Sequence, residues 1–212
     1  MLEALEMDQR RGELRLFSFQ IERTMSDKKF RLYNKGGRRK FLTAGERREF
    51  LDACHDAPAH ERSLCLVLAY TGCQLVEALA LTAANIDLAG DAILLSEDGQ
   101  RWRGVPVPPS VIRSLDVIHG VRRSQQAKDG GKSAKLWPVD RTTAWRWVCR
   151  VMKKAGIEGP QAVPRGLRHG FAIDAIAEGV RLETVAQWMG HQDLEITKIY
   201  ADTVRAEKSH HN

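Results

Sequence analysis

Apolar residues recur at helical spacing over residues 43–81. The sequence Thr43-Ala-Gly-Glu46 has the form of a capping box, in which the Thr hydroxyl and the Glu carboxylate accept hydrogen bonds from free backbone N–H groups. It predicts a helix over residues 43–57. A second helix is predicted over residues 61–70, which are apolar enough to lie at the centre of the core. Thr71-Gly72 ends that helix, and a third is predicted over residues 74–81.

The apolar pattern then changes to short extended runs. Strands are predicted over residues 86–88, 92–95 and 105–107, with an Asp98-Gly99 turn signal before the last of them. Pro106 has no N–H to donate to a neighbouring strand, so the third strand is expected at an edge of the sheet. Helical spacing returns afterwards, over residues 108–121, residues 142–155 and three more helices between residues 163 and 204. This order predicts an α+β fold that is mainly helical, with a small antiparallel sheet.

The composition is that of a folded globular protein, with 43% hydrophobic and 28% charged residues. We expect an N-terminal appendage over residues 1–40, ending in a mobile basic linker (Asn34 to Lys40), and one main domain over residues 41–212. No stretch approaches the ~20 apolar residues of a membrane span, and no signal-peptide pattern is present. A cytoplasmic protein without a membrane partner is therefore expected. The four cysteines show no C-x-x-C pairing and are interpreted as reduced, mostly buried thiols, with metal binding a remote alternative.

The formal net charge of +6 is unevenly distributed. Residues 28–48 contain nine Lys or Arg against one Glu, and residues 101–154 contain thirteen against three Asp. Residues 55–98, between these blocks, contain only Arg62 against seven acids. Such blocks favour one surface that attracts a polyanion, although a solvated surface without a partner explains a charge excess alone. The candidate contacts to nucleic acid are Arg38, Arg39, Lys40, Arg101, Arg103, Arg146 and Arg150.

Three motifs near the C-terminus follow one another at characteristic distances: Leu167-Arg168-His169, then Gly190-His191, then Tyr200 nine residues after the histidine. With the upstream sequence TGCQLVEAL, they resemble the catalytic domain of tyrosine recombinases, the phage integrases. The resemblance covers residues 41–204. It implies the catalytic-domain fold of that family, double-stranded DNA as the partner, no cofactor or metal, and leaves open a homo-oligomer on DNA. The family's usual N-terminal core-binding domain is too large for the 40 preceding residues.

The resemblance also assigns roles to the residues of these motifs. Tyr200 matches the nucleophile that forms a 3′-phosphotyrosine, although a tyrosine taken alone is more often an ordinary half-buried residue. His191 matches the histidine that donates a hydrogen bond to the scissile phosphate; its alternative role is to cap a helix after Gly190. Arg168 matches an arginine whose planar guanidinium binds two phosphate oxygens. His169 is interpreted as structural.

Three positions depart from the family pattern. The first-box motif T-G-x-R has Gln74 in place of arginine, and an amide donates hydrogen bonds without bringing a charge. The hairpin position of the general-acid lysine is occupied by Asp98, and residues 96–104 contain no lysine. Arg165 stands where the second-box histidine is usual, and it is a candidate to supply the charge missing at Gln74. Losing one of two phosphate-binding cations costs ~3–5 kcal/mol at the transition state.

These features leave three readings. The chain is a site-specific recombinase acting through Tyr200; or it has the recombinase fold and binds DNA with weak or lost strand transfer, as a regulator or accessory factor; or it is an unrelated helical protein with coincidental motifs. Four motifs in the family's order argue against the third. The substitutions at Gln74, Asp98 and Arg165 favour the second over the first.

Overall fold

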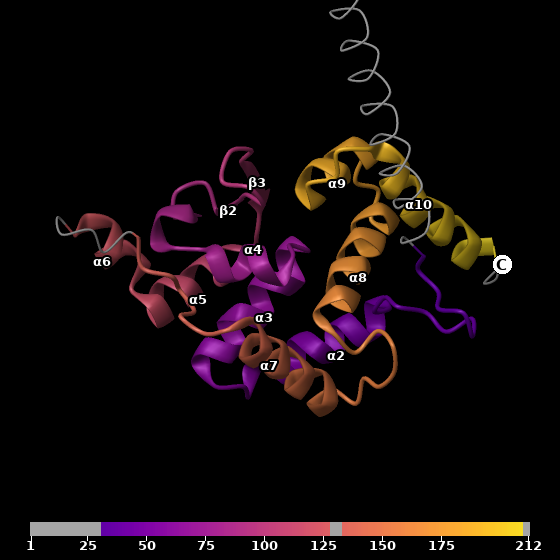
Figure 1. Ribbon diagram of the computed structural model, residues 1–212, viewed down its shortest axis with the longest axis horizontal. Coiled ribbons are helices and arrows are strands. Elements are labelled where there is room, and N and C mark those ends of the chain that lie inside the picture. The colour runs from indigo at the N-terminus through magenta and orange to yellow at the C-terminus, as the bar shows by residue number, and fades with distance from the viewer. Residues whose placement is uncertain (1–30, 128–132, 210–212) are drawn as a thin grey trace, which may run out of the picture. The chain divides into compact units, whose positions relative to one another are not determined.

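The computed structural model describes residues 31–127 and 133–209. From Leu32 onward the chain forms one compact unit. Its elements run from α2 at the start of this unit to α10 near the C-terminus, with a small sheet in between (Figure 1). The predicted α+β fold, mainly helical with a small antiparallel sheet, is confirmed.

The first helices begin and end as their sequences predict. In α2 (Ala44–His55) the Thr43 hydroxyl accepts from the backbone N–H of Glu46, and the Glu46 carboxylate accepts from that of Thr43. Helix α3 (Ala59–Thr71) ends at Gly72, whose φ of 61° is costly for any residue with a Cβ. It contacts α2, α5, α7 and α8, and is therefore the central helix of the core. Helix α4 (Leu75–Ala80) follows directly.

A three-stranded antiparallel sheet interrupts the helices after the short 3₁₀ turn η1 (Ala83–Asn85). The strands β1 (Ile86–Asp87), β2 (Ala92–Leu95) and β3 (Arg103–Pro106) lie in sequence order. Ile93, fully buried, pairs with Ile86 on one side and Val105 on the other. Pro106 lies in the edge strand β3, as predicted from its missing N–H donor.

The predicted helix over residues 108–121 is present, and a short helix that was not predicted follows it. Helix α5 (Pro109–His119) ends at Gly120, which has a φ of 62°, and α6 (Val121–Gln126) begins directly after it. Val121 is the one buried residue of α6, which is otherwise polar, so the apolar pattern gives no signal for this helix. Helix α7 (Arg141–Lys154) begins at Asp140, whose carboxylate accepts from the backbone N–H groups of Thr142 and Thr143.

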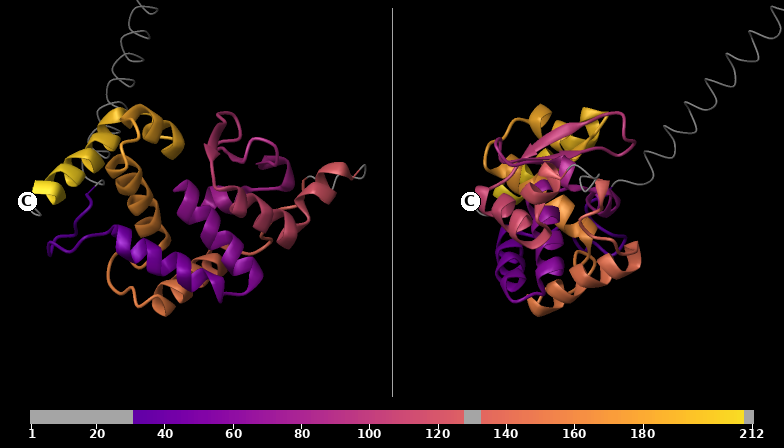
Figure 2. Two further views of the ribbon diagram at one scale, coloured as in Figure 1. Left: turned by 180° about the vertical axis from the view of Figure 1, so that it is seen from behind. Right: turned by 90° about the vertical axis from the view of Figure 1, so that its left-hand side faces the viewer.

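The last three helices are α8 (Pro164–Ala177), α9 (Leu182–Met189) and α10 (Leu194–Ser209). Helix α10 packs against both α8 and α9, as the orange and yellow segments show from two sides (Figure 2). Two glycines of α8 lie very close to neighbouring backbone, in the segment before α8 and in the chain before α2. A Cβ on Gly166 would lie 1.9 Å from the backbone oxygen of Gln161, and one on Gly170 would lie 2.9 Å from that of Leu42. These two glycines permit backbone contact on one side of α8.

The segment before α2 is held by defined contacts. Tyr33 forms a β-bridge with Arg39, and Leu32 and Phe41 are buried. Arg39 pairs with Glu46, the carboxylate that also completes the capping box of α2. Residues 34–40 therefore form a tight turn on the domain where a mobile linker was expected. Residues 1–30 of the predicted appendage lie outside the described residues, so the boundary at residue 41 stays a prediction.

All four cysteines are free thiols. Cys54, Cys65 and Cys73 are buried and Cys149 is partly buried, as predicted. Burial raises the pKa of the Cys73 thiol to about 11, so it stays protonated at neutral pH. Within the described residues, no helix is long and apolar enough to cross a membrane.

A histidine outside the C-terminal motifs is also built into the core. His119 Nε2 lies 2.9 Å from Ser63 Oγ, and Ser63 Oγ in turn accepts from Trp137 Nε1 at 3.0 Å. Burial, reinforced by the neighbouring His60, lowers the pKa of His119 to about 4. The ring is therefore neutral at pH 7, and it ties α5 to α3 and to Trp137.

Candidate active site

Arg168 on α8 links two helix ends. Its Nη1 donates to the carbonyl oxygen of Gly72, at the end of α3, and its Nη2 donates to that of Met189, at the end of α9, each at 2.7 Å. Both carbonyls lie where a helix leaves its oxygens without partners, and a cation is favourable there. Burial lowers the pKa of Arg168, but an arginine in this environment remains charged. The guanidinium is thus fixed in place by the fold itself.

His191 follows the turn that ends α9. Gly190 closes the helix with a φ of 71°, and the backbone N–H of His191 donates to the carbonyl oxygen of Ala186. His191 Nδ1 lies 2.9 Å from Thr197 Oγ1 on α10. Burial lowers the pKa of His191 to about 4, with smaller contributions from Arg168 and Arg103. The imidazole is therefore neutral at pH 7, and one ring nitrogen remains for a further hydrogen bond.

Tyr200 lies inside the domain. Its side chain is fully buried on α10, and its hydroxyl lies 2.8 Å from Nδ1 of His169 on α8. The ring stacks parallel to that of His191, with centroids 6.2 Å apart. Burial raises the pKa of Tyr200, and Arg168 and Arg165 only partly oppose this. The phenol is neutral at pH 7 and shielded from solvent by its own domain.

His169 is the partner of Tyr200. It is 6% exposed, and burial lowers its pKa to about 3, helped by the nearby cations Arg168 and Arg165. A ring held neutral beside a neutral phenol suits the structural role expected for it.

Three histidines whose pKa values are lowered in the folded protein predict a loss of stability in mild acid. His119, His169 and His191 stay neutral in the folded protein down to about pH 4, 3 and 4, whereas in the unfolded chain they bind protons below about pH 6.5. Between about pH 6.5 and 4 the unfolded state binds more protons, so the free energy of unfolding should fall as the pH falls. The slope is up to about 1.4 kcal/mol per pH unit for each histidine. Urea titrations at pH 7.5, 6 and 5 measure it, with His119→Gln expected to give a shallower slope; a pH-independent free energy of unfolding contradicts the prediction.

Gln74 caps the beginning of α4. Its backbone N–H donates to Glu77 Oε2 at 2.7 Å, while its side-chain Nε2 contacts Glu97 Oε1 at 3.4 Å. The side chain of Glu77 is 2% exposed, and its Oε1 pairs with Arg103 Nη2 at 2.7 Å. The first-box position therefore has a fixed backbone, but its side chain is a neutral amide that faces a carboxylate.

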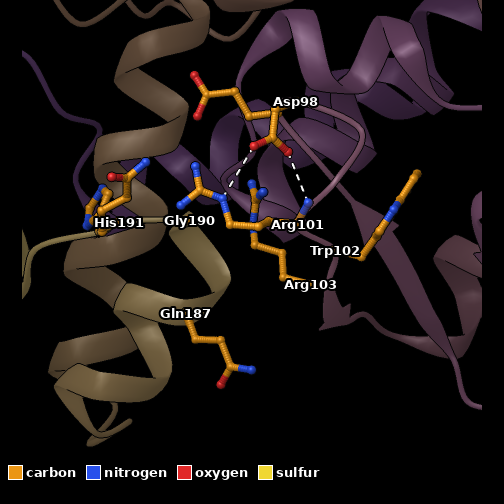
Figure 3. A pocket seen from close by; sticks show the side chains of 9 residues that line it. Asp98, Arg101, Trp102, Arg103, Gln187, Gly190 and His191 are labelled. Carbon is orange, nitrogen blue, oxygen red and sulfur yellow. Dashed lines mark hydrogen bonds and ion pairs between the residues drawn. The ribbon is translucent and has the colours of Figure 1, made fainter.

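Asp98 lies at the tip of the β2–β3 hairpin. Its Oδ1 accepts from the backbone N–H groups of Gln100 and Arg101, each at 3.0 Å, and its Oδ2 pairs with Arg101 Nε (Figure 3). These bonds, first of all the one from the Arg101 backbone, hold the pKa of the carboxyl well below its usual range. Asp98 is therefore ionised at all physiological pH values and has no proton to donate.

A pocket of about 220 Å³ separates this hairpin from the end of α9 (Figure 3). Its lining combines carboxylates, cations and amides from both elements: Glu97, Asp98, Arg101, Trp102, Arg103, Gln187, Gly190, His191 and Gln192. The hairpin and His191 thus line one pocket. Trp102, which the sequence analysis did not single out, is 56% exposed at its mouth.

The other residues predicted to contact phosphate or DNA differ in how far they are exposed. Arg165 is exposed on the first turn of α8, and Arg146 is exposed on α7. Arg150 pairs with Glu61 but keeps 62% of its side chain exposed. Arg103 was expected at the surface, yet its side chain is only 10% exposed. Its partners Glu77 and Trp188 are far away in the sequence, so no local pattern could place it inside. Arg38, Arg39, Lys40 and Arg101 complete the set, with Arg39 already paired to Glu46.

A mainly helical domain that brings an arginine, a histidine and a tyrosine together beside a three-stranded sheet has the architecture of a tyrosine recombinase catalytic domain. The crystal structure of XerA recombinase has this fold, with a TM-score of 0.64 at 24% identity over 81% of this chain and 63% of that one. XerH recombinase bound to its difH substrate gives a TM-score of 0.66 at 21% identity, over 79% of this chain and 55% of that one. The sequence model of the phage integrase family matches residues 40–207. The chain belongs to the phage integrase family.

Curated relatives agree with this assignment. Tyrosine recombinase XerD of Mycobacterium leprae is 29% identical over 148 residues, which are 66% of this chain and 46% of that protein. XerD of Vibrio vulnificus is 28% identical over 166 residues, 72% of this chain and 54% of that protein. The chain thus spans about half the length of these relatives, and the family resemblance found from the motifs is confirmed.

Proposed function

We propose that this protein binds double-stranded DNA through the tyrosine recombinase fold and has weak or no strand-transfer activity, acting as a regulator or accessory factor. The observation that carries the proposal is the β2–β3 hairpin, where an ionised Asp98 carboxylate occupies the position that the family resemblance gives to a proton-donating lysine. A second carboxylate, Glu97, lies beside Gln74.

The charge at this site opposes catalysis of phosphate transfer. Arg168 is a buried cation, but Gln74 brings no charge, and Arg103 is neutralised by Glu77. Glu97 and Asp98 add two negative charges to the pocket that His191 lines. A transition state with developing charge on phosphate oxygens is stabilised by preorganised cations, so two carboxylates near it raise the barrier.

No group in the pocket replaces the missing proton donor. Arg101 and Arg103 are the basic side chains of the pocket, and a guanidinium donates hydrogen bonds rather than protons. His191 is neutral at pH 7 and supplies a hydrogen bond rather than a labile proton. The leaving 5′ oxygen would therefore depart without efficient protonation, which supports slow or absent cleavage.

The alternative function is an active recombinase that cleaves and rejoins DNA through a 3′-phosphotyrosine. It is favoured by one observation, the convergence of Arg168, His191 and Tyr200 around the end of α9. A nicked DNA substrate that traps the covalent intermediate separates the two functions. Adduct formed by the parent protein and abolished by Tyr200→Phe establishes the recombinase, whereas DNA binding without adduct supports the proposal.

We expect DNA binding itself to depend steeply on salt. The basic blocks over residues 28–48 and 101–154 supply the cations, and the structural neighbour XerH has been solved bound to its difH substrate. If ~6–8 phosphates are neutralised, log K should fall with log salt at a slope of roughly −5 to −7. A filter-binding titration measures the slope, and a value near zero overturns the prediction.

A matched pair of variants tests which surface binds. Arg146→Gln removes an exposed cation of the second basic block, and it should reduce the magnitude of the salt slope by about 1. Arg205→Gln removes an exposed cation outside both blocks and should leave the slope unchanged. Equal effects of the two variants would point to a general loss of positive charge rather than to this surface.

A further inference from the structure

Arg103 joins three parts of the site through one side chain. Its Nε donates to the carbonyl oxygen of Trp188 near the end of α9, at 2.8 Å, and its Nη2 pairs with Glu77 on α4. Its own backbone starts β3, directly after the hairpin that carries Asp98. The guanidinium also packs on Gly190: a Cβ added there would lie 3.0 Å from Arg103 Cζ.

Two guanidiniums therefore share the C-terminal end of α9. Arg168 binds the carbonyl oxygen of Met189 from α8, and Arg103 binds that of Trp188 from β3. The last carbonyls of a helix have no partners within it and carry partial negative charge, so both cations stabilise this end. The turn that they fix is the one that presents His191.

The same side chain connects this turn to the first-box position. Glu77 accepts from the backbone N–H of Gln74 through one carboxylate oxygen and pairs with Arg103 through the other. The chain of contacts from Gln74 through Glu77 and Arg103 to Trp188 is partly buried, with Glu77 buried at its centre. Residues 74 and 188 are 114 positions apart in the sequence. The contacts therefore fix the position of the end of α9 relative to the beginning of α4, which secondary structure alone cannot do.

We propose that Arg103 is the positioning residue of this site: it holds the His191 turn in register with α4 and the β2–β3 hairpin. This rests on the proposed function only in taking His191 as the residue that faces a DNA phosphate. Arg103 itself does not contact DNA in this role, because its side chain is committed to Trp188 and Glu77.

The geometry requires an arginine. Nε and Nη2 lie on different parts of a rigid planar group and reach a carbonyl and a carboxylate at the same time. A lysine has one ammonium on a flexible chain, so Arg103→Lys should keep the charge near Glu77 and lose the bond to Trp188. Arg103→Met removes both interactions and leaves Glu77 as an unpaired buried carboxylate.

Hydrogen exchange of backbone amides, followed by NMR on the free protein, tests the proposal. In Arg103→Met the amides of Gly190 and His191 should exchange about 10- to 100-fold faster than in the parent, the factor expected for loss of a charge-assisted hydrogen bond. After correction for any change in global stability, amides of α3 such as that of Leu68 should keep their parent rates. Arg103→Lys should give an intermediate acceleration at the same two amides.

Arg101→Met is the matched control, because it removes the same charge from an exposed side chain two residues away and should change neither amide. Unchanged protection of Gly190 and His191 in Arg103→Met, or an equal acceleration in α3, overturns the proposal. If Arg103→Met does not fold, Arg103→Lys is judged by the same criteria. Exchange is measured without DNA, so its outcome is separate from that of the salt titration.

Discussion

Gln74→Arg combined with Asp98→Lys should raise the yield of covalent protein–DNA adduct by roughly 10²–10⁴-fold over the parent, because the two changes return a second cation and a proton donor to the phosphate. A lysine beside other cations has a pKa below its usual ~10, which suits it to protonate the leaving oxygen. The positions of Arg168, His191 and Tyr200 are already supplied by the fold.

The structure favours both substitutions at the level of the backbone. The N–H of residue 74 is held by Glu77, so an arginine there would start from a fixed point at the beginning of α4. Asp98 is exposed at a hairpin tip, where a lysine meets no steric obstacle; it does forgo the bonds to the backbone of Gln100 and Arg101. Since both groups serve one transition state, the double mutant should exceed the product of the single mutants.

The measurement is phosphotyrosyl adduct on a nicked substrate, resolved on a denaturing gel, for the parent, both single mutants and the double mutant. Tyr200→Phe in the double-mutant background is the control and should give no adduct. If the double mutant binds DNA like the parent and still forms none, the fault lies in access to Tyr200. Its hydroxyl would then remain bound to His169 and out of reach of the phosphate.

Gly166→Ala should destabilise the domain by about 3 kcal/mol or more, because the added Cβ would lie 1.9 Å from the backbone oxygen of Gln161. A backbone atom cannot rotate away as a side chain can, so α8 and the segment before it must move apart. For a domain of this size that loss lowers Tm by roughly 6–12 °C. Helix α8 carries Arg168 and His169, so the shift also disturbs the links from Arg168 to Gly72 and Met189.

Gly45→Ala provides the matched control. Gly45 is also helical, on α2, and the nearest atom to its added Cβ is 3.9 Å away. Alanine is favoured over glycine inside a helix by roughly 0.5–1 kcal/mol, so this variant should be slightly more stable than the parent. Thermal unfolding, followed by circular dichroism, measures Tm for both variants. A Tm of Gly166→Ala that stays within about 2 °C of the parent value contradicts the close packing of α8.

Local chemistry explains why most elements could be predicted. The capping box at Thr43 and the glycine at residue 72 act on their immediate neighbours, so their effects are readable from the sequence alone. Helix α6 was missed because its sequence, VRRSQQ, contains a single apolar residue and so has no apolar face to recognise.

The sequence predicts which residues belong to the candidate site, but not which contacts they make. The order and spacing of the motifs identify Arg168, His191 and Tyr200 as a group. Nothing local indicates that the phenol is fully buried against His169 or that Arg103 lies inside the domain. Those contacts join residues 31 and 85 positions apart, and they depend on how α8, α9, α10 and β3 pack together.

The catalytic residues that this chain retains also have structural roles, so their presence in the sequence is not by itself a sign of activity. Arg168 closes two helix ends, His191 is bonded to Thr197, and Tyr200 fills the core beside His169, so each would be kept by selection for folding alone. Asp98 and Arg165, which replace the usual residues, are exposed and free of that requirement. In a protein that no longer cleaved DNA, exposed catalytic residues would be substituted before buried ones. The half-complete motif seen here is the pattern that the proposed loss of strand transfer would leave behind.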